Sequence, residues 1–320
     1  MSFVRTVLGD IAPAEMGLTF SHEHIIIEES FPTLANKDFI LNDVDKVSEE
    51  LIQFFAEGGR TVVDTMPADC GRNILKLAEV SRRTGVHIIA PTGIHLEKYY
   101  PPNHWQYHLN EEALTDLFVK DILEGIDEYD YGCPIIKRTV HKAGMIKLAT
   151  GDASFTQHQI KIFRAVVSAH LKTGAPILTH TNNGNQAIEQ VELFAKLGAD
   201  IRHIVLSHVD RNKDIQYHKA LMQTGVYVEY DSHFRWKNDE DNWTYTLLEN
   251  LLPDFSNQIT VGMDMARNSY WRSYGGGTGL NYLFTNFKQQ MEKRGLSEHL
   301  EKIFLTNPQK LFCFNSISKK

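Results

Sequence analysis

The chain has 320 residues, of which 42% are hydrophobic and 23% charged, values typical of a globular protein with a substantial core. Its net charge of −7, with histidine neutral, provides no basic field, so we expect no nucleic-acid partner. No apolar run approaches about 18 residues and no signal peptide is visible, so we expect no membrane partner. The three cysteines, an odd number without a CxxC motif, favour a reducing compartment, and we predict a cytoplasmic location.

Short apolar segments alternate with helical patterns along the chain. The predicted strands, in order, are residues 18–28, 61–66, 87–94, 143–150, 176–181, 203–209, 226–231 and 259–265. The predicted helices are residues 44–57, 72–84, 111–124, 156–172, 184–197, 213–223, 239–251 and 280–293, with a short closing helix at 308–314. The aromatic segment 95–110 is too long for an ordinary connection, and we predict a functional loop or lid there.

Eight alternations of strand and helix predict parallel strands joined by helical crossovers. Their number and the chain length fit an α/β fold of the (β/α)₈ type, a TIM barrel that forms one domain over residues 1–320. The alternative is an open doubly wound sheet. Such a sheet would normally carry a glycine-rich phosphate-binding turn after its first strand, and this sequence has none there.

Two histidines on the first predicted strand are the first sign of a site. His22 and His24 are two residues apart, so on a strand they point to the same side, about 7 Å from each other. Glu23 points to the opposite side, and we predict that it has a structural or supporting role. A His-x-His pair can chelate one metal ion, but the motif is weak unless other strands deliver further ligands.

Further polar residues lie on later strands or near their C-terminal ends, where (β/α)₈ enzymes place their catalytic groups. These residues are Lys147, His180, His208 and Asp264, each within an otherwise apolar or small-residue segment. One buried histidine is usually a core residue that has found a partner. Several polar groups that converge in a core would be costly to desolvate unless a metal centre compensated. We therefore predict a metal centre at the C-terminal ends of the barrel strands.

Lys147 is the most unusual of these residues, because a lysine in a barrel strand is expensive to bury as a cation. One interpretation is a buried ion pair with an aspartate or glutamate. The other is that burial and nearby cations lower the pKa of Lys147 until the amine is neutral and adds carbon dioxide. The product, N6-carboxylysine, is a bidentate anion that could bridge two metal ions.

The remaining candidate ligands divide into two sets around such a bridge. His22, His24 and Asp264 would hold one ion. His180 and His208 would hold the other, with the carbamate and a hydroxide between the two ions. Two ions at that spacing lower the pKa of bound water and polarise an electrophile.

These segments resemble the phosphotriesterase family of the amidohydrolase superfamily. The opening RTVLGDI…GLTFSHEH is similar to the N-terminal hairpin and metal-binding strand of that family, and MIKLAT, ILTHT, SHVD, GMD and TNPQKLF match its landmarks in order. The resemblance extends from about Arg5 to Phe314. It implies a binuclear centre, usually of zinc, with manganese or cobalt as substitutes, and it makes a homodimer possible. Some relatives replace the bridging lysine by glutamate, whereas this chain keeps Lys147.

The loops after the last two strands are expected to select the substrate. In (β/α)₈ enzymes these two loops often form a phosphate site, and their basic residues favour a small anionic substrate. The best candidates are Arg267 and Tyr270, which are three residues apart and so can face one side of their loop. Lys237 and Arg235 follow. The alternative for each of these charges is an ordinary solvated position in a loop.

We therefore predict a lactonase that opens a phosphorylated sugar lactone. The bridging hydroxide would attack the carbonyl carbon, and Asp264 would pass its proton to the leaving alkoxide. A phosphotriesterase or another phosphoester hydrolase could use the same metals. A mononuclear deaminase of the same superfamily and a catalytically silent metal-binding protein are further alternatives.

Three other residues receive predictions that the structure can examine. Asp64 is expected either to orient a ligand or to pair with a neighbour. His95, in the long third loop, is expected to lie at the surface or to contact substrate. Asp210 is expected either to hold the sixth loop in place or to touch the substrate.

Overall fold

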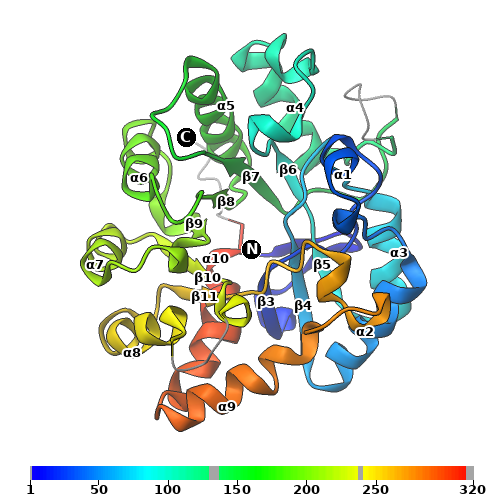
Figure 1. The fold of residues 1–320 in the computed structure, drawn as a ribbon. Coiled ribbons are helices and arrows are strands. Elements are labelled where there is room, and N and C mark those ends of the chain that lie inside the picture. Colours follow the sequence, from blue (N-terminus) through cyan, green and yellow to red (C-terminus); the bar gives the residue numbers. More distant parts are fainter. Residues whose placement is uncertain (1, 130–136, 237–240, 315–320) are drawn as a thin grey trace.

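A computed structural model of the chain describes residues 2–129, 137–236 and 241–314 (Figure 1). Figure 1 shows strands at the centre and helices in a ring around them. The strands are β1 Val4–Thr6, β2 Gly9–Ile11, β3 Leu18–Glu23, β4 Gly59–Asp64, β5 His87–Ile89, β6 Pro91–Gly93, β7 Met145–Ala149, β8 Ile177–His180, β9 Ile204–Ser207, β10 Tyr227–Tyr230 and β11 Ile259–Val261. The helices are α1 Phe31–Ala35, α2 Val44–Ala56, α3 Ile74–Thr84, α4 Glu111–Leu123, α5 Gln157–Thr173, α6 Ala187–Lys196, α7 Ile215–Gln223, α8 Trp243–Phe255, α9 Asn286–Lys293 and α10 Asn307–Leu311.

The strands form a closed barrel behind an N-terminal hairpin. β1 and β2 pair antiparallel, and all pairs between β3 and β11 are parallel, in the orders β3-β4-β5 and β6-β7-β8-β9-β10-β11. The backbone N–H groups of Met263 and Asp264 donate to the carbonyl of His22 at 3.1 and 2.9 Å, which joins the last strand to the first. A Cβ at Gly262 would lie 2.6 Å from the backbone nitrogen of His22, so this seam requires glycine. The predicted (β/α)₈ barrel is confirmed, and the open sheet is excluded.

The third predicted strand, residues 87–94, is divided into two strands in the structure. β5 pairs with β4, whereas β6 pairs with β7, and Ala90 lies between the two segments. Pro91 has no N–H to donate, so the ladder cannot continue unchanged through it. The first predicted strand is also shorter than expected and ends at Glu23, because the N–H of Ile25 donates to Asp64 Oδ1 at 2.8 Å instead of to a strand.

Local capping explains most helix boundaries. α5 begins after Thr156, whose side chain accepts from the N–H of Gln159, and it ends at Gly174 with a φ of 73°. The predicted helix 280–293 is interrupted, since residues Leu280–Leu283 form a 3-10 turn before α9. α8 continues past its predicted end to Phe255, and its predicted start at residue 239 lies outside the described residues. In the parts that the structure describes, no helix combines the length and apolar character needed to cross a bilayer.

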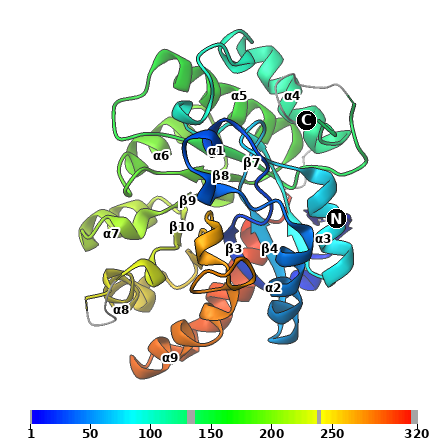
Figure 2. The same cartoon turned by 45° about the vertical axis from the view of Figure 1, so that its right-hand side comes forward.

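The barrel interior changes from apolar to polar along its axis. Met145 and Leu178 belong to a buried cluster that also contains residues of β1 and α10, and this cluster fills the N-terminal end of the barrel. Residues two positions later on a strand face the same side, which places Lys147 above Met145 and His180 above Leu178. Figure 2 shows the ring of helices around the strands from a second direction. The polar layer, and with it the candidate site, therefore lies at the C-terminal end.

Candidate metal centre

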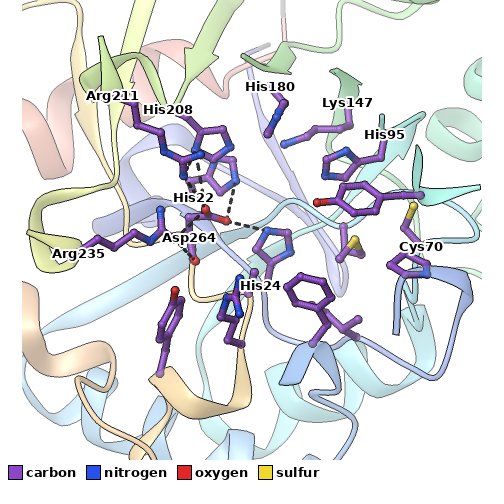
Figure 3. Close-up of a pocket in the computed structure, with 18 residues that line it drawn as sticks. His22, His24, Cys70, His95, Lys147, His180, His208, Arg211, Arg235 and Asp264 are labelled. Atoms are coloured by element: carbon purple, nitrogen blue, oxygen red, sulfur yellow. Dashed lines mark hydrogen bonds and ion pairs between the residues drawn. The ribbon is translucent and has the colours of Figure 1, made fainter. Parts of the chain in front are cut away.

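A cavity of about 320 Å³ opens at the C-terminal ends of the barrel strands (Figure 3). All six predicted metal ligands line it: His22, His24, Lys147, His180, His208 and Asp264. Three predicted substrate residues, Arg235, Arg267 and Tyr270, line it as well. Lys237, the fourth, lies outside the described residues. The cavity is also lined by residues for which the sequence suggested no role, among them Phe39, Cys70, Tyr99 and Arg211.

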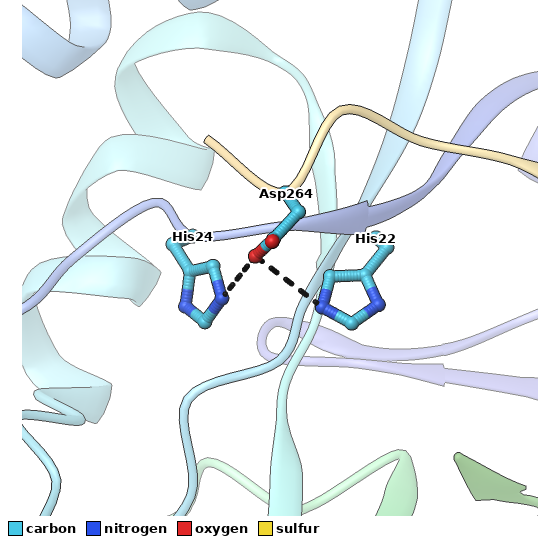
Figure 4. Close-up of side chains that lie close together, drawn as sticks. All are labelled: His22, His24 and Asp264. Atoms are coloured by element: carbon cyan, nitrogen blue, oxygen red, sulfur yellow. Dashed lines mark ion pairs between the residues drawn. The ribbon is translucent and has the colours of Figure 1, made fainter. Parts of the chain in front are cut away.

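His22, His24 and Asp264 form one group of candidate ligands (Figure 4). Asp264 Oδ1 lies 3.1 Å from His24 Nε2 and 3.8 Å from His22 Nε2. One ligand atom from each of the three residues lies within 4.8 Å of the others, so together they could hold one divalent ion. Both histidines therefore face the same side, as predicted from the strand.

A buried network orients His22. Its Nδ1 lies 2.8 Å from Glu229 Oε2 and 2.9 Å from Ser207 Oγ, and Ser207 also donates to Glu229. The Nε2 atom is buried and has no hydrogen-bond partner among the described residues. A partner on one ring nitrogen that leaves the other nitrogen available is the usual arrangement around a metal-bound histidine. The sequence analysis missed Glu229, although a carboxylate inside an apolar strand was a signal that could have found it.

The second group of candidate ligands, His180 and His208, lies directly beside the first. The ring centroids of His180 and His208 are 4.6 Å apart, and those of His22 and His208 are 4.8 Å apart. His180 Nε2 is buried and lacks a hydrogen-bond partner within the described chain, whereas His208 Nδ1 lies 2.7 Å from Asp231 Oδ2. His22, His208 and Asp231 also form a group within 4.8 Å, so Asp231 either orients His208 or serves as a ligand itself. The two groups share His22, so the described residues offer two overlapping positions at which an ion could be held.

Two of the candidate ligands have unusual backbone conformations. His208, directly after β9, has a φ of 66°, and Asp264, after β11, has a φ of 50°. Non-glycine residues in this left-handed region cost on the order of 1–3 kcal/mol, and such residues concentrate at functional sites. In both cases the strained residue directs its side chain into the cavity, where the other candidate ligands lie.

Lys147 is buried in this site and has no ion-pair partner among the described residues. Burial lowers its pKa to about 8, although Asp264 and Glu229 act in the opposite direction. Within the described residues no carboxylate oxygen lies within 4.0 Å of the amine, so the structure does not contain the buried ion pair that was one interpretation. At Gly93 a Cβ would lie 2.0 Å from the carbonyl oxygen of Lys147, so close contact between β6 and β7 fixes the backbone of this lysine.

The charges of the other candidate ligands also suit metal binding. Burial lowers the pKa of His22, His180 and His208 well below the usual value, and Lys147 or Arg211 lowers it further, so these imidazoles are neutral. Burial raises the pKa of Asp264, but the Arg235 guanidinium and His208 outweigh burial. The pKa of Asp264 consequently lies well below its usual value, and the group is an anion.

Two arginines converge on Asp264 (Figure 3). Arg235 donates through Nη2 to Asp264 Oδ2 at 2.8 Å and to its backbone oxygen at 2.7 Å. Nη2 of Arg211 lies 3.2 Å from the same Oδ2 atom and 3.6 Å from Asp231 Oδ1. Arg235 was predicted to bind substrate, and the structure places it in the cavity wall but engaged with Asp264. Arg211 had no prediction, although it stands three residues after a candidate ligand.

Arg267 and Tyr270 lie together in the wall of the cavity, as their spacing predicted. The Tyr270 ring contacts both neighbouring guanidinium groups, with Cζ of Arg235 5.7 Å and Cζ of Arg267 6.0 Å from the ring centroid. Phe234 packs edge-on against the same ring at 5.2 Å. An aromatic hydroxyl flanked by two permanent cations is well suited to bind an anion.

The structure also separates the alternatives for three further residues. His95 is buried in the cavity wall with its ring centroid 5.3 Å from that of His180, so it is not a surface residue. Asp64 holds the backbone beside His24 by accepting from Ile25, and burial raises the pKa of Asp64 to about 6. Asp210 accepts from the Ser232 N–H and the Thr244 hydroxyl, so it holds the sixth loop and does not line the cavity.

A parallel (β/α)₈ barrel with histidines, a buried lysine and an aspartate around one cavity at its C-terminal end defines a metal-dependent hydrolase. The phosphotriesterase family matches residues 2–312, and the chain belongs to this family. The resemblance drawn from the sequence motifs is thereby confirmed.

Individual relatives agree with this placement. The chain is 32% identical to a phospho-furanose lactonase from Mycoplasmopsis synoviae, over 98% of this chain and 92% of the relative. Among solved structures, an amidohydrolase from Mycoplasma synoviae has a TM-score of 0.94 and 31% identity, and covers 98% of this chain and 93% of its own. A lactonase from Listeria monocytogenes has a TM-score of 0.89 and 30% identity, over 98% of this chain and the whole of that one.

Proposed function

We propose that this protein is a metal-dependent lactonase that opens the ring of a phosphorylated sugar lactone. The observation that carries the proposal is one cavity with two kinds of wall: candidate metal ligands on the strand ends and permanent cations on the loops. The first wall suits hydrolysis of a carbonyl ester, and the second suits a substrate with an anionic group. The relative named phospho-furanose lactonase supports the same substrate class.

We further propose a binuclear centre of zinc, for which manganese or cobalt could substitute. The proposed ligands are His22, His24, Asp264, His180, His208 and a carbamate on Lys147. This set is supported by buried ring nitrogens that have no hydrogen-bond partner in the described part of the chain, and by a lysine amine that is neutral above about pH 8. When bound, the ions supply an activated water molecule and polarise the lactone carbonyl.

The residues of the chain itself would bind the substrate and move its protons. Asp264 is anionic at neutral pH and is oriented by Arg235, so it can accept a proton and deliver it to the alkoxide that leaves the carbonyl. Arg267 and Tyr270 would bind the phosphate, with Arg235 and Lys237 as further donors. A guanidinium offers a fork of donors that matches a phosphate oxygen pair, and its charge does not depend on pH.

The test is a panel of matched lactones with and without a phosphate, assayed by proton release with zinc-loaded protein. Two charge-assisted hydrogen bonds to phosphate should favour the phosphorylated lactone by about 10²-fold in kcat/KM. Equal turnover of both forms would contradict the phosphate assignment. Absence of turnover on every ester, lactone and amide would instead support a catalytically silent metal-binding protein, and one metal per chain would favour a deaminase-like centre.

Phosphotriester hydrolysis is the second candidate, because part of the cavity wall is apolar. Ile27, Phe39 and Met66 line that part, and a neutral aryl ester could pack against them. Phosphotriesters therefore belong in the same panel at matched metal loading. The cytoplasmic location and the homodimer remain predictions.

A further inference from the structure

One acidic residue outside the cavity holds the loop that carries Arg267 and Tyr270. Asp38 Oδ1 accepts from the backbone N–H of Ser269 at 2.9 Å, and its Oδ2 accepts from the Ser269 hydroxyl at 2.8 Å. The same Oδ2 lies 3.5 Å from Nη1 of Arg267. These contacts join the loop after β3 to the loop after β11, across 231 residues of sequence.

The segment that presents Asp38 is itself ordered. Residues Lys37–Phe39 form a 3-10 turn whose N-terminal Asn36 side chain accepts from the N–H of Asp38 at 3.0 Å. The next residue, Phe39, lines the cavity, and Cζ of Arg267 lies 5.2 Å from the centroid of its ring. The turn therefore offers Arg267 a carboxylate on one side and an aromatic face on the other.

We propose that Asp38 is a positioning residue for the anion-binding wall, which is the part of the cavity wall formed by Arg235, Arg267 and Tyr270 on the loops. It does not line the cavity, so it acts through Ser269 and Arg267 and not by touching substrate. By tying the turn Asn268–Tyr270 to the loop after β3, it keeps the side chains of Arg267 and Tyr270 ordered before the substrate arrives. The inference rests on the proposed function in one respect, namely that the substrate carries an anionic group.

The expected effect lies in binding and not in the chemical step. Without the tether, the loop must be ordered when the anion binds, and this entropy cost weakens binding. The candidate ligands His22 and Asp264 are held by the barrel seam and not by this loop, so kcat should change little. The carboxylate of Asp38 is only partly buried, so its charge contributes little attraction or repulsion near Arg267, and the hydrogen bonds to Ser269 should dominate.

The same loop has a second tether that serves as a matched control. Glu50 on α2 accepts from the N–H groups of Ser273 and Leu280 at 3.0 and 2.9 Å. Figure 2 shows this part of the loop, in orange, beside α2. Glu50 fixes the far half of the loop, whereas Asp38 fixes the half that bears the anion-binding residues. Loss of the Glu50 contacts should therefore lower stability without changing the preference for phosphate.

The experiment compares Asp38→Ala and Asp38→Asn with the matched pair Glu50→Ala and Glu50→Gln and with the wild-type enzyme, all zinc-loaded. KM and kcat are measured for a phosphorylated lactone and its unphosphorylated counterpart, and inorganic phosphate is titrated as a competitive inhibitor. Asp38→Ala should raise KM for the phosphorylated lactone and the inhibition constant of phosphate about tenfold, with kcat within twofold. The unphosphorylated lactone should be unaffected. Asp38→Asn keeps an acceptor for Ser269 and should stay within about threefold of wild type.

Several results would overturn the inference. One is a wild-type enzyme that prefers the phosphorylated lactone while Asp38→Ala keeps that preference unchanged. Another is an equal loss of kcat on both lactones, or the same change of preference in Glu50→Ala, since either would indicate a general structural role. A wild-type enzyme that neither prefers the phosphorylated lactone nor binds inorganic phosphate would overturn the proposed function, and the inference would fall with it.

Discussion

The two walls of the cavity are built in different ways. The metal-ligand wall stands on paired strands or within three residues of their ends: Lys147 is in register with Gly93 and Leu178, and His180 with Ser207. The anion-binding wall stands on short 3-10 turns after β10 and β11, and its position depends on side-chain tethers such as Asp38. A barrel can therefore keep one set of reactive groups rigid, while variation in its loops alters which substrate is bound.

The walls also differ in charge. Burial lowers the pKa of the histidines, so the metal-ligand wall offers neutral imidazoles and the anionic Asp264 to a cation, and the amine of Lys147 becomes neutral above about pH 8. The anion-binding wall carries the guanidinium groups of Arg235 and Arg267, which are permanent cations. Changes in the metal-ligand wall should thus abolish chemistry, and changes in the anion-binding wall should alter substrate preference.

The largest expected effect is that of Lys147→Met. Methionine keeps much of the buried side-chain volume but removes the amine that would carry the carbamate. We expect metal content to fall from two ions to one per chain and kcat to fall by roughly 10³-fold. Elemental analysis and steady-state kinetics would measure this. Leu148→Met on the same strand should retain both ions, and an unchanged kcat in Lys147→Met would refute the bridging role.

Asp264→Asn should lower kcat by about 10²–10³-fold, because the neutral amide cannot accept a proton and is a poorer ligand. KM for the phosphorylated lactone should change much less, since Arg267 and Tyr270 remain in place. Steady-state kinetics on both lactones would measure the difference. Asp210→Asn is the control, because that carboxylate is buried but does not line the cavity. A rise in KM without a loss of kcat would assign Asp264 to substrate binding.

Formation of the carbamate should depend on pH in a defined direction. Only the deprotonated amine adds carbon dioxide, and its fraction rises about tenfold per pH unit below the pKa and levels off above it. Because the pKa of Lys147 is lowered to about 8, the signal should level off near pH 8 and not near pH 10. Nuclear magnetic resonance of metal-free protein with labelled bicarbonate would measure this, with Lys147→Met as the blank. A signal still rising at pH 10 would contradict it.

Arg267→Met should have the smallest effect, confined to substrates that carry an anion. Loss of one charge-assisted hydrogen bond should raise KM for the phosphorylated lactone about tenfold, with kcat nearly constant. Arg267→Lys should recover part of this loss, since lysine keeps the charge but not the fork. The unphosphorylated lactone serves as the internal control, and an equal change on both lactones would place Arg267 outside the phosphate site.

The sequence predicted the features carried by strands better than those carried by loops. The alternation of strands and helices predicted the barrel, and the position of Lys147 and His180 near strand ends predicted their convergence, because parallel strands place equivalent ends at one edge. The predicted end of the first strand was wrong, because the side chain of Asp64 on β4 accepts the N–H of Ile25. Such a replacement depends on a neighbour that is distant in sequence.

The arginines illustrate what local pattern cannot determine. The sequence predicted Arg235 as a substrate residue, and the structure places it in the cavity wall. The sequence could not show that Arg235 would engage Asp264, and it did not single out Arg211 at all. Loop residues have no fixed period, so their direction depends on the partners they meet in three dimensions.

The sequence by itself therefore determined the barrel and the six candidate ligands that converge at its C-terminal end, because these follow from strand period and from the parallel arrangement. Its motifs carried the resemblance to the family. Only the tertiary structure decided which groups contact one another: Glu229 on His22, the arginines on Asp264 and Asp38 on Ser269. The physical reason is that each of these contacts joins segments far apart in the chain, and its geometry exists only after the barrel has closed.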